Sequence, residues 1–137
     1  MPIVTTIEGR IAQVAIDRPE KRNTLSSELC KDLAREFLEL NDDTRVRSIV
    51  LCGHNNVFCA GLDIEEQLAE NTPIFNEFQK VIDALDALSK PVVAAVSGPA
   101  VSQGAAMLYH CDLVFAGEHA LFSMPGLALG QTPRYGV

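Results

Sequence analysis

The sequence predicts an α/β protein in which β-strands alternate with helices along the chain. Two long segments carry apolar residues at helical spacing, and short, continuously apolar runs typical of strands covered on both faces follow them. The composition, with 47% hydrophobic and 21% charged residues, is that of a folded globular chain rather than a disordered one. We therefore expect residues 1–137 to form a single domain around one core.

Local signals define where the elements begin and end. Ser26 or Ser27 can cap the first long helix, and Pro73 stands at the first position of the second, where proline is favoured. In chain order the expected elements are a hairpin of residues 3–7 and 11–16, a helix that ends at 41–43, a strand at 49–52, a helix that ends at 89–91, a strand at 92–96, a short helix at 100–110, and strands at 112–116 and 120–122.

Charge and hydropathy exclude several classes of partner. The net charge is −7 and no cluster of Lys and Arg appears, which argues against a nucleic-acid surface. No apolar run reaches the roughly 18 to 20 residues of a membrane span. Met1 is followed by Pro2 and an alternating segment without a basic start, so we expect no signal peptide. The expected partners therefore include neither nucleic acid nor a membrane.

The four cysteines lack CxxC spacing and lie in apolar stretches. We interpret them as small buried hydrophobes, which suits a reducing compartment, with a structural disulfide as the weaker alternative. The expected location is the cytoplasm. The cysteines are Cys30, Cys52, Cys59 and Cys111.

Two loops of small residues, each after a predicted buried strand, are the best candidates for chemistry. They are residues 58–61 and residues 98–106. Small side chains let a ligand approach the backbone, and the second loop opens a helix, where free N–H groups favour negative charge. Two such N–H donors could form an oxyanion hole for a thioester enolate. The competing interpretation is close packing of helices on the sheet, and the second loop matches neither phosphate-binding glycine pattern.

Four stretches together resemble the enoyl-CoA hydratase/isomerase family, the crotonase superfamily. They are IDRPEKRNTLSSEL, RVRSIVLCGHNNVFCAGLDIEE, SKPVVAAVSGPAV and CDLVFAGEHALFSMPGLALG, in the order found in the family. The resemblance implies a ClpP/crotonase-like spiral of strand-strand-helix units. It also implies that the chain corresponds to the N-terminal half of a family member and stops before the C-terminal helices. Those helices cover the acyl site and build trimers, so a homotrimer or a dimer of trimers is expected.

The same resemblance implies the binding residues. The backbone N–H groups of Ala60 and Gln103 would form the oxyanion hole for an acyl-CoA thioester. No metal or separate cofactor is implied, because coenzyme A enters as part of the substrate. The residues that would line the coenzyme A groove are Lys21, Arg22, Asn23, Leu25, Ala60, Gly61, Leu62, Asp63, Ile64 and Gly104.

The chain departs from the family at its acid/base positions. Ala106 and Gly126 stand where hydratases carry their two glutamates, and Arg134 stands where some isomerases carry a third. These three residues and Tyr135 are candidates for the acyl pocket. Two functions stay open: an enzyme that works through a thioester enolate, and a catalytically silent acyl-CoA-binding or assembly subunit.

Other titratable residues are expected to be structural. Asp63 and Asp112 suit turn and strand-end roles, and His110 suits a cap at a helix end. Glu65 and Glu66 are expected on a solvated face.

Overall fold

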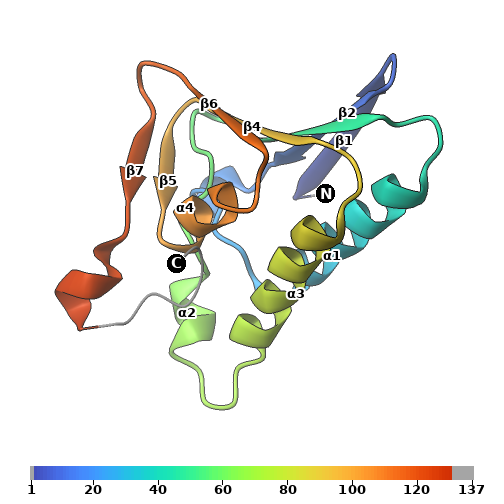
Figure 1. The fold of residues 1–137 in the computed structure, drawn as a ribbon. Helices are drawn as coiled ribbons and strands as arrows, with labels where there is room; N and C mark the ends of the chain where they lie inside the picture. Colours follow the sequence, from blue (N-terminus) through green and yellow to red (C-terminus); the bar gives the residue numbers. More distant parts are fainter. Residues whose placement is uncertain (1, 131–137) are drawn as a thin grey trace.

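The computed structural model describes residues 2–130, which form an α/β fold as predicted (Figure 1). Helices α1 and α3 lie side by side against one face of the main sheet. The elements are β1 (Ile3–Glu8), β2 (Ile11–Ile16), η1 (Pro19–Lys21), α1 (Ser27–Asp42), β3 (Ser48–Gly53), α2 (Ile64–Gln67), α3 (Ile74–Ala87), β4 (Val92–Val96), β5 (Pro99–Val101), α4 (Gln103–Leu108), β6 (Leu113–Ala116), β7 (Leu121–Ser123) and η2 (Pro125–Leu129).

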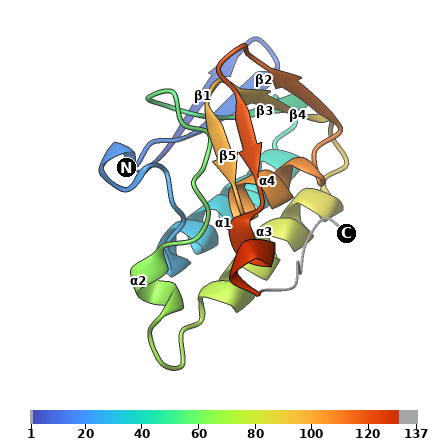
Figure 2. The ribbon, with the colours of Figure 1, turned by 90° about the vertical axis from the view of Figure 1, so that its left-hand side faces the viewer.

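The main sheet has five strands in the order β1-β2-β3-β4-β6. The predicted hairpin pairs β1 antiparallel to β2, and every later strand pairs in parallel. The chain therefore returns through helical connections between the parallel strands, as βαβ units require. A second sheet of two parallel strands, β5 and β7, lies on the other side of α4 from α1 and α3 (Figure 2).

The core lies between the main sheet and the two long helices. Phe37 of α1 and Phe78 of α3 are fully buried, and they share this core with Ile49 and Leu51 of β3. Each such side chain stabilises the fold by about 1.5–3 kcal/mol through burial. Ser26 caps α1 by accepting a 3.1 Å hydrogen bond from the N–H of Leu29, so the first of the two predicted caps is the one used.

Two predicted boundaries are wrong. Residues 99–101 form strand β5, and α4 begins only at Gln103, so the helix predicted for residues 100–110 is too long. The cause is tertiary, because β5 pairs with β7 and its Val101 N–H donates to Cys59 O over 2.9 Å. Pro73 is the N-cap of α3 rather than its first helical residue.

Strand β6 and the short strand β7 expose most of their apolar side chains. Leu113 and Phe115 of β6 are 57% and 64% exposed, and Leu121 and Phe122 of β7 are also exposed. A parallel sheet normally has both faces covered. The edge strand β6 of the main sheet and β7 of the second sheet therefore both present apolar side chains to solvent. Among residues 2–130, none of the helices has the length and hydropathy of a membrane span.

Candidate functional site

The two small-residue loops, after β3 and after β4, lie against each other. Cys59 and Ala100 form a parallel bridge, and Cys59 N–H donates to Pro99 O over 3.2 Å. Gly104 permits this approach, because a Cβ at that position would lie 2.1 Å from Cys59 O. Gly61 lies close to the second loop as well, since a Cβ there would be 3.3 Å from the Ser102 Cβ.

A third segment, residues 21–25, lies on the other side of the first loop. Leu25 N–H donates to Gly61 O over 2.8 Å, and Asp63 N–H donates to Leu25 O over 2.8 Å. These bonds place Leu62 opposite Leu25 in a parallel bridge. The structure therefore brings together the three segments that were predicted to bind the coenzyme A ester.

The backbone N–H groups of these loops differ in whether they have an acceptor. Ala60, the predicted oxyanion donor, donates its N–H to Arg22 O over 3.2 Å. The N–H of Leu62 takes no part in the bridge with Leu25, and among residues 2–130 it has no acceptor. Gln103 is the first residue of α4, a position whose N–H lacks an intrahelical acceptor, and no described residue accepts from it.

The sequence did not single out the N–H of Leu62 as a free donor, although Leu62 was predicted to line the coenzyme A groove. The bridge explains why. Leu25 bonds to Gly61 O and Asp63 N–H, which are the atoms on either side of Leu62, so the N–H of Leu62 is left unpaired. That alternation depends on the register with residues 21–25, which no local pattern indicates.

Ser102 gives the second loop its shape at the start of α4. Its backbone has φ 55 and ψ −119, a conformation that glycine adopts more readily than serine. Ser102 N–H donates to Ser123 O over 2.8 Å, and its Oγ–H donates to Gln103 Oε1 over 2.7 Å. These bonds hold a strained turn from which the N–H of Gln103 begins the helix.

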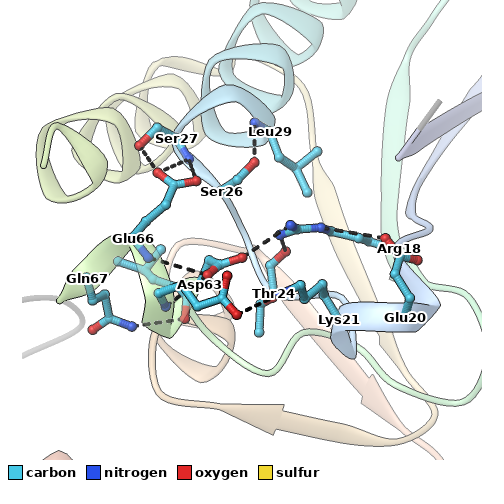
Figure 3. A network of polar contacts seen from close by, with 12 residues as sticks. Arg18, Glu20, Lys21, Thr24, Ser26, Ser27, Leu29, Asp63, Glu66 and Gln67 are labelled. Carbon is cyan, nitrogen blue, oxygen red and sulfur yellow. Dashed lines mark hydrogen bonds and ion pairs between the residues drawn. The ribbon is translucent and has the colours of Figure 1, made fainter. Parts of the chain in front are cut away.

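An ion pair holds the segment just after Leu62 (Figure 3). Arg18 Nη2 lies 3.2 Å from Asp63 Oδ2, and Arg18 Nη1 donates to Thr24 O over 3.0 Å. Asp63 Oδ1 accepts from the N–H groups of Glu65 and Glu66, which caps α2. The turn role predicted for Asp63 is confirmed, and its carboxylate is almost buried at 8% exposed.

Glu66 was predicted to lie on a solvated face, but it does not. Its carboxylate accepts from the backbone N–H of Ser27 over 3.1 Å and from the Ser27 hydroxyl over 2.5 Å (Figure 3). A negative charge at the first turn of α1 is favourable, because the N–H groups there lack intrahelical acceptors. Glu65 is solvated as predicted, with its side chain 84% exposed and 3.3 Å from Lys21 Nζ.

Asn23 joins the segment 18–25 to the loop after β3. It is fully buried, with φ 57, and its Nδ2 donates to His54 O and Val57 O over 3.0 and 2.7 Å. Its Oδ1 accepts from Arg18 N–H over 2.8 Å. Its amide is thus committed to the protein itself, whereas the side chains of the neighbouring Arg22 and of Ile64, also predicted to line the groove, are exposed.

The candidates for the acyl pocket are only partly described. Ala106 is buried within α4 at 1% exposed, and Gly126 lies in η2 and is partly exposed. Arg134 and Tyr135 lie outside the described residues. Their role in an acyl pocket stays a prediction.

Two further residues predicted to be structural make contacts at the end of α4. Asp112 Oδ2 accepts from Val92 N–H over 2.7 Å, which confirms its strand-end role. His110 lies at the end of α4 and also contacts α3, because its Nδ1 lies 2.7 Å from Asp86 Oδ1. Its Nε2 is buried without a partner among the described residues.

The four thiols are free, and burial suppresses their ionisation. Burial raises the pKa of Cys59, in the first loop, to about 12, and burial likewise raises the pKa of Cys30. A thiol in that state is a poor nucleophile at neutral pH. The buried thiols are therefore poor candidates for a nucleophile in these loops. Among residues 2–130, no group of three His, Cys, Asp or Glu side chains is arranged to hold a metal ion.

Comparisons with known proteins agree on one family. Residues 6–137 match the family model described as enoyl-CoA hydratase/isomerase. The short-chain-enoyl-CoA hydratase of Clostridium acetobutylicum is 35% identical over 139 residues, covering 98% of this chain and 53% of the relative. The 2,3-dehydroadipyl-CoA hydratase of Escherichia coli is 32% identical, again covering 98% of this chain and 53% of the relative.

Solved structures show the same likeness. A putative enoyl-CoA hydratase/carnithine racemase from Magnetospirillum magneticum has a TM-score of 0.90 at 34% identity, over 97% of this chain and 53% of that one. OdaA of Pseudomonas aeruginosa has a TM-score of 0.87 at 36% identity, over 97% of this chain and 54% of that one. The fold is thus the crotonase fold predicted from the sequence. The chain spans about half the length of the curated relatives and solved structures it matches.

Proposed function

Because the chain belongs to the enoyl-CoA hydratase/isomerase family, we propose that it binds an acyl-CoA thioester with the carbonyl oxygen between the N–H groups of Leu62 and Gln103. The observation that carries this proposal is that both N–H groups lack an acceptor among residues 2–130. Leu62 directly follows the first loop and Gln103 lies in the second, and these two loops are in contact. Two such donors stabilise the charge that develops on the oxygen as an enolate forms. Ala60 is the second candidate donor, but a ligand there must displace Arg22 O.

The coenzyme A moiety is proposed to lie along segments 21–25 and 60–64. This placement is supported by the pairing of Leu25 with Leu62, which joins the two segments side by side. Arg22 is exposed beside them, and Lys21 forms a surface ion pair with Glu65. Such cations are suited to the phosphates of coenzyme A. No cofactor beyond the coenzyme A of the substrate is proposed.

The reaction is proposed to differ from efficient hydration. Hydration needs one group to activate water and another to deliver a proton to the α-carbon. Ala106 is apolar and buried, and Gly126 has no side chain, so neither can transfer a proton. The missing carboxylates are also compatible with the second candidate function, an acyl-CoA-binding or assembly subunit without turnover.

Turnover and binding measured together distinguish the two functions. The full-length protein that carries this chain is tested with a panel of short enoyl-CoA esters, with crotonyl-CoA binding measured alongside. We expect binding, and hydration slower than in ordinary hydratases by about 10²- to 10⁴-fold for each missing acid/base group. Turnover of another ester on the panel would show that the protein is an enzyme, whereas binding without any turnover would support the silent subunit.

A gain-of-function variant sharpens this test. Ala106→Glu combined with Gly126→Glu should raise crotonyl-CoA hydration, because it restores both carboxylates. The matched control places the first carboxylate one residue earlier in α4, as Ala105→Glu with Gly126→Glu. Ordinary hydratase rates in the unmodified protein would contradict the proposed role of positions 106 and 126.

Assembly into a homotrimer or a dimer of trimers is part of the proposal, as is a cytoplasmic location. The exposed apolar side chains of β6 and β7 support the assembly, because large apolar patches usually mark protein contacts. Light scattering of the full-length protein tests it, and a stable monomer would contradict it.

A further inference from the structure

We infer that Arg18 is a positioning residue of the thioester site, which holds the Leu62 N–H through Asp63 and the segment 21–25 through Thr24. The inference deepens the proposed function and rests on it. Arg18 lies at the end of the hairpin, outside the loops that carry the N–H donors, and was not among the residues predicted to bind the ester.

Asp63, the residue after the Leu62 donor, is fixed from three directions. Its backbone N–H donates to Leu25 O, its Oδ1 accepts from the N–H groups at the start of α2, and its Oδ2 faces Arg18 Nη2 at 3.2 Å. The Arg18 and Asp63 side chains are only 19% and 8% exposed, so solvent screens their attraction weakly. Removing the Arg18 contact leaves a nearly buried carboxylate unpaired beside the donor.

Arg18 also contacts the segment 21–25, which was proposed to bind coenzyme A. Its Nη1 donates to Thr24 O over 3.0 Å, and its backbone N–H donates to Asn23 Oδ1 over 2.8 Å. One guanidinium therefore spans a carboxylate on the donor segment and a carbonyl on the coenzyme A segment. The planar fork of arginine makes both contacts at once, whereas the single ammonium group of lysine does not. The contact with Glu20 at 3.8 Å is exposed and contributes little.

Two conservative variants of the full-length protein test the inference. Arg18→Lys keeps the charge but loses the fork, and Asp63→Asn keeps an oxygen to cap α2 but loses the charge facing Arg18. The matched control is Arg45→Lys, which changes an exposed pair with Asp43 far along the chain. The probe is crotonyl-CoA labelled with ¹³C at the thioester carbonyl, read by infrared difference spectroscopy, with free coenzyme A as the reference ligand.

Arg18→Lys is expected to lose about half or more of the carbonyl shift to lower frequency, because a displaced donor polarises the oxygen less. The preference for crotonyl-CoA over free coenzyme A should fall about tenfold, the size expected of one charged hydrogen bond. Asp63→Asn should show the same fall, and the double variant should add little to it. Hydrogen exchange at residues 62–66 of the unliganded protein should be faster in Arg18→Lys than in Arg45→Lys.

An equal carbonyl shift in Arg18→Lys and the unmodified protein would overturn the role of Arg18 and leave the proposed function intact. Fully additive losses in the double variant would overturn it too. A missing shift in the unmodified protein would contradict the proposed function itself. In that case hydrogen exchange of the unliganded protein still tests whether Arg18 holds residues 62–66. If exchange at residues 62–66 is the same in Arg18→Lys as in the unmodified protein, the inference is overturned.

Discussion

The loop after β3 and the loop after β4 supply one proposed donor each, but different forces hold them. The loop after β3 has backbone bonds to residues 21–25 and 99–101, and side chains add to them through the amide of Asn23 and the Arg18–Asp63 ion pair. The loop after β4 is held by backbone contact, since Gly104 lies where a Cβ would be 2.1 Å from Cys59 O. Substitution of the side chains that support the first loop should therefore have graded effects, whereas the second loop has no room for a side chain at Gly104.

The largest expected effect is the loss of the Asn23 amide. Asn23→Ala removes three hydrogen bonds in a buried position and leaves Val57 O and Arg18 N–H without the partner that the amide supplies. We expect the free energy of unfolding to fall by about 4 kcal/mol, measured by urea denaturation. Asn55→Ala is the matched control, because Asn55 also has a positive φ of 60 but is exposed. A similar loss at both positions would show that backbone strain, not the amide contacts, sets the effect.

The backbone contact of the second loop gives the next largest effect. Gly104→Ala should lower the free energy of unfolding by about 3 kcal/mol, because the added methyl group overlaps backbone atoms that cannot move independently. Gly117→Ala is the control, since a Cβ there is 3.7 Å from Val96 O, an ordinary contact. Equal stability of the two variants would mean that the loops do not approach as closely as described.

The third prediction concerns Glu66, whose carboxylate joins α2 to the start of α1. Glu66→Gln should cost about 1.5 kcal/mol in urea denaturation, because its carboxylate binds both the N–H and the hydroxyl of Ser27. Glu65→Gln is the neighbouring control, whose exposed ion pair with Lys21 should contribute less than about 1 kcal/mol. If Glu65→Gln proved the more costly change, the assignment of Glu66 to the start of α1 would be wrong.

The smallest effect is a gain in stability. Ser102→Gly should raise the free energy of unfolding by about 1 kcal/mol, because glycine adopts φ 55 and ψ −119 without the strain that serine carries. Ser97→Gly, at an exposed position without positive φ, should instead lower stability slightly. A loss at Ser102 would indicate that its hydroxyl contact with Gln103 outweighs the strain.

The same contrast explains how far the sequence predicted the structure. Helix α1 and its Ser26 cap follow from local periodicity and capping chemistry, and both are present. Strand β5 was predicted as helix, because its pairing with β7 is set by residues more than twenty positions away. The two small-residue loops were predicted from their composition and their place after strands, and the segment 21–25 was predicted from the family resemblance. The structure brings all three together.

The hydrogen-bonding state of individual residues in the site could not be predicted without the register between the paired segments. Ala60 was predicted as a donor, yet its N–H is bonded to Arg22 O, while Leu62 is left free by its bridge with Leu25. Glu66 was expected in solvent, because nothing local indicates that α2 reaches the start of α1. In both cases the deciding contact joins segments far apart in the chain, which periodicity and capping signals do not report.

A crystal structure of the full-length protein with a bound acyl-CoA would show which N–H groups hold the thioester oxygen. We expect the thioester oxygen within about 3 Å of both the Leu62 and Gln103 nitrogens, with Ala60 N–H still bonded to Arg22 O. An oxygen bound to Ala60 N–H in place of Arg22 O, or a thioester that contacts neither loop, would contradict it.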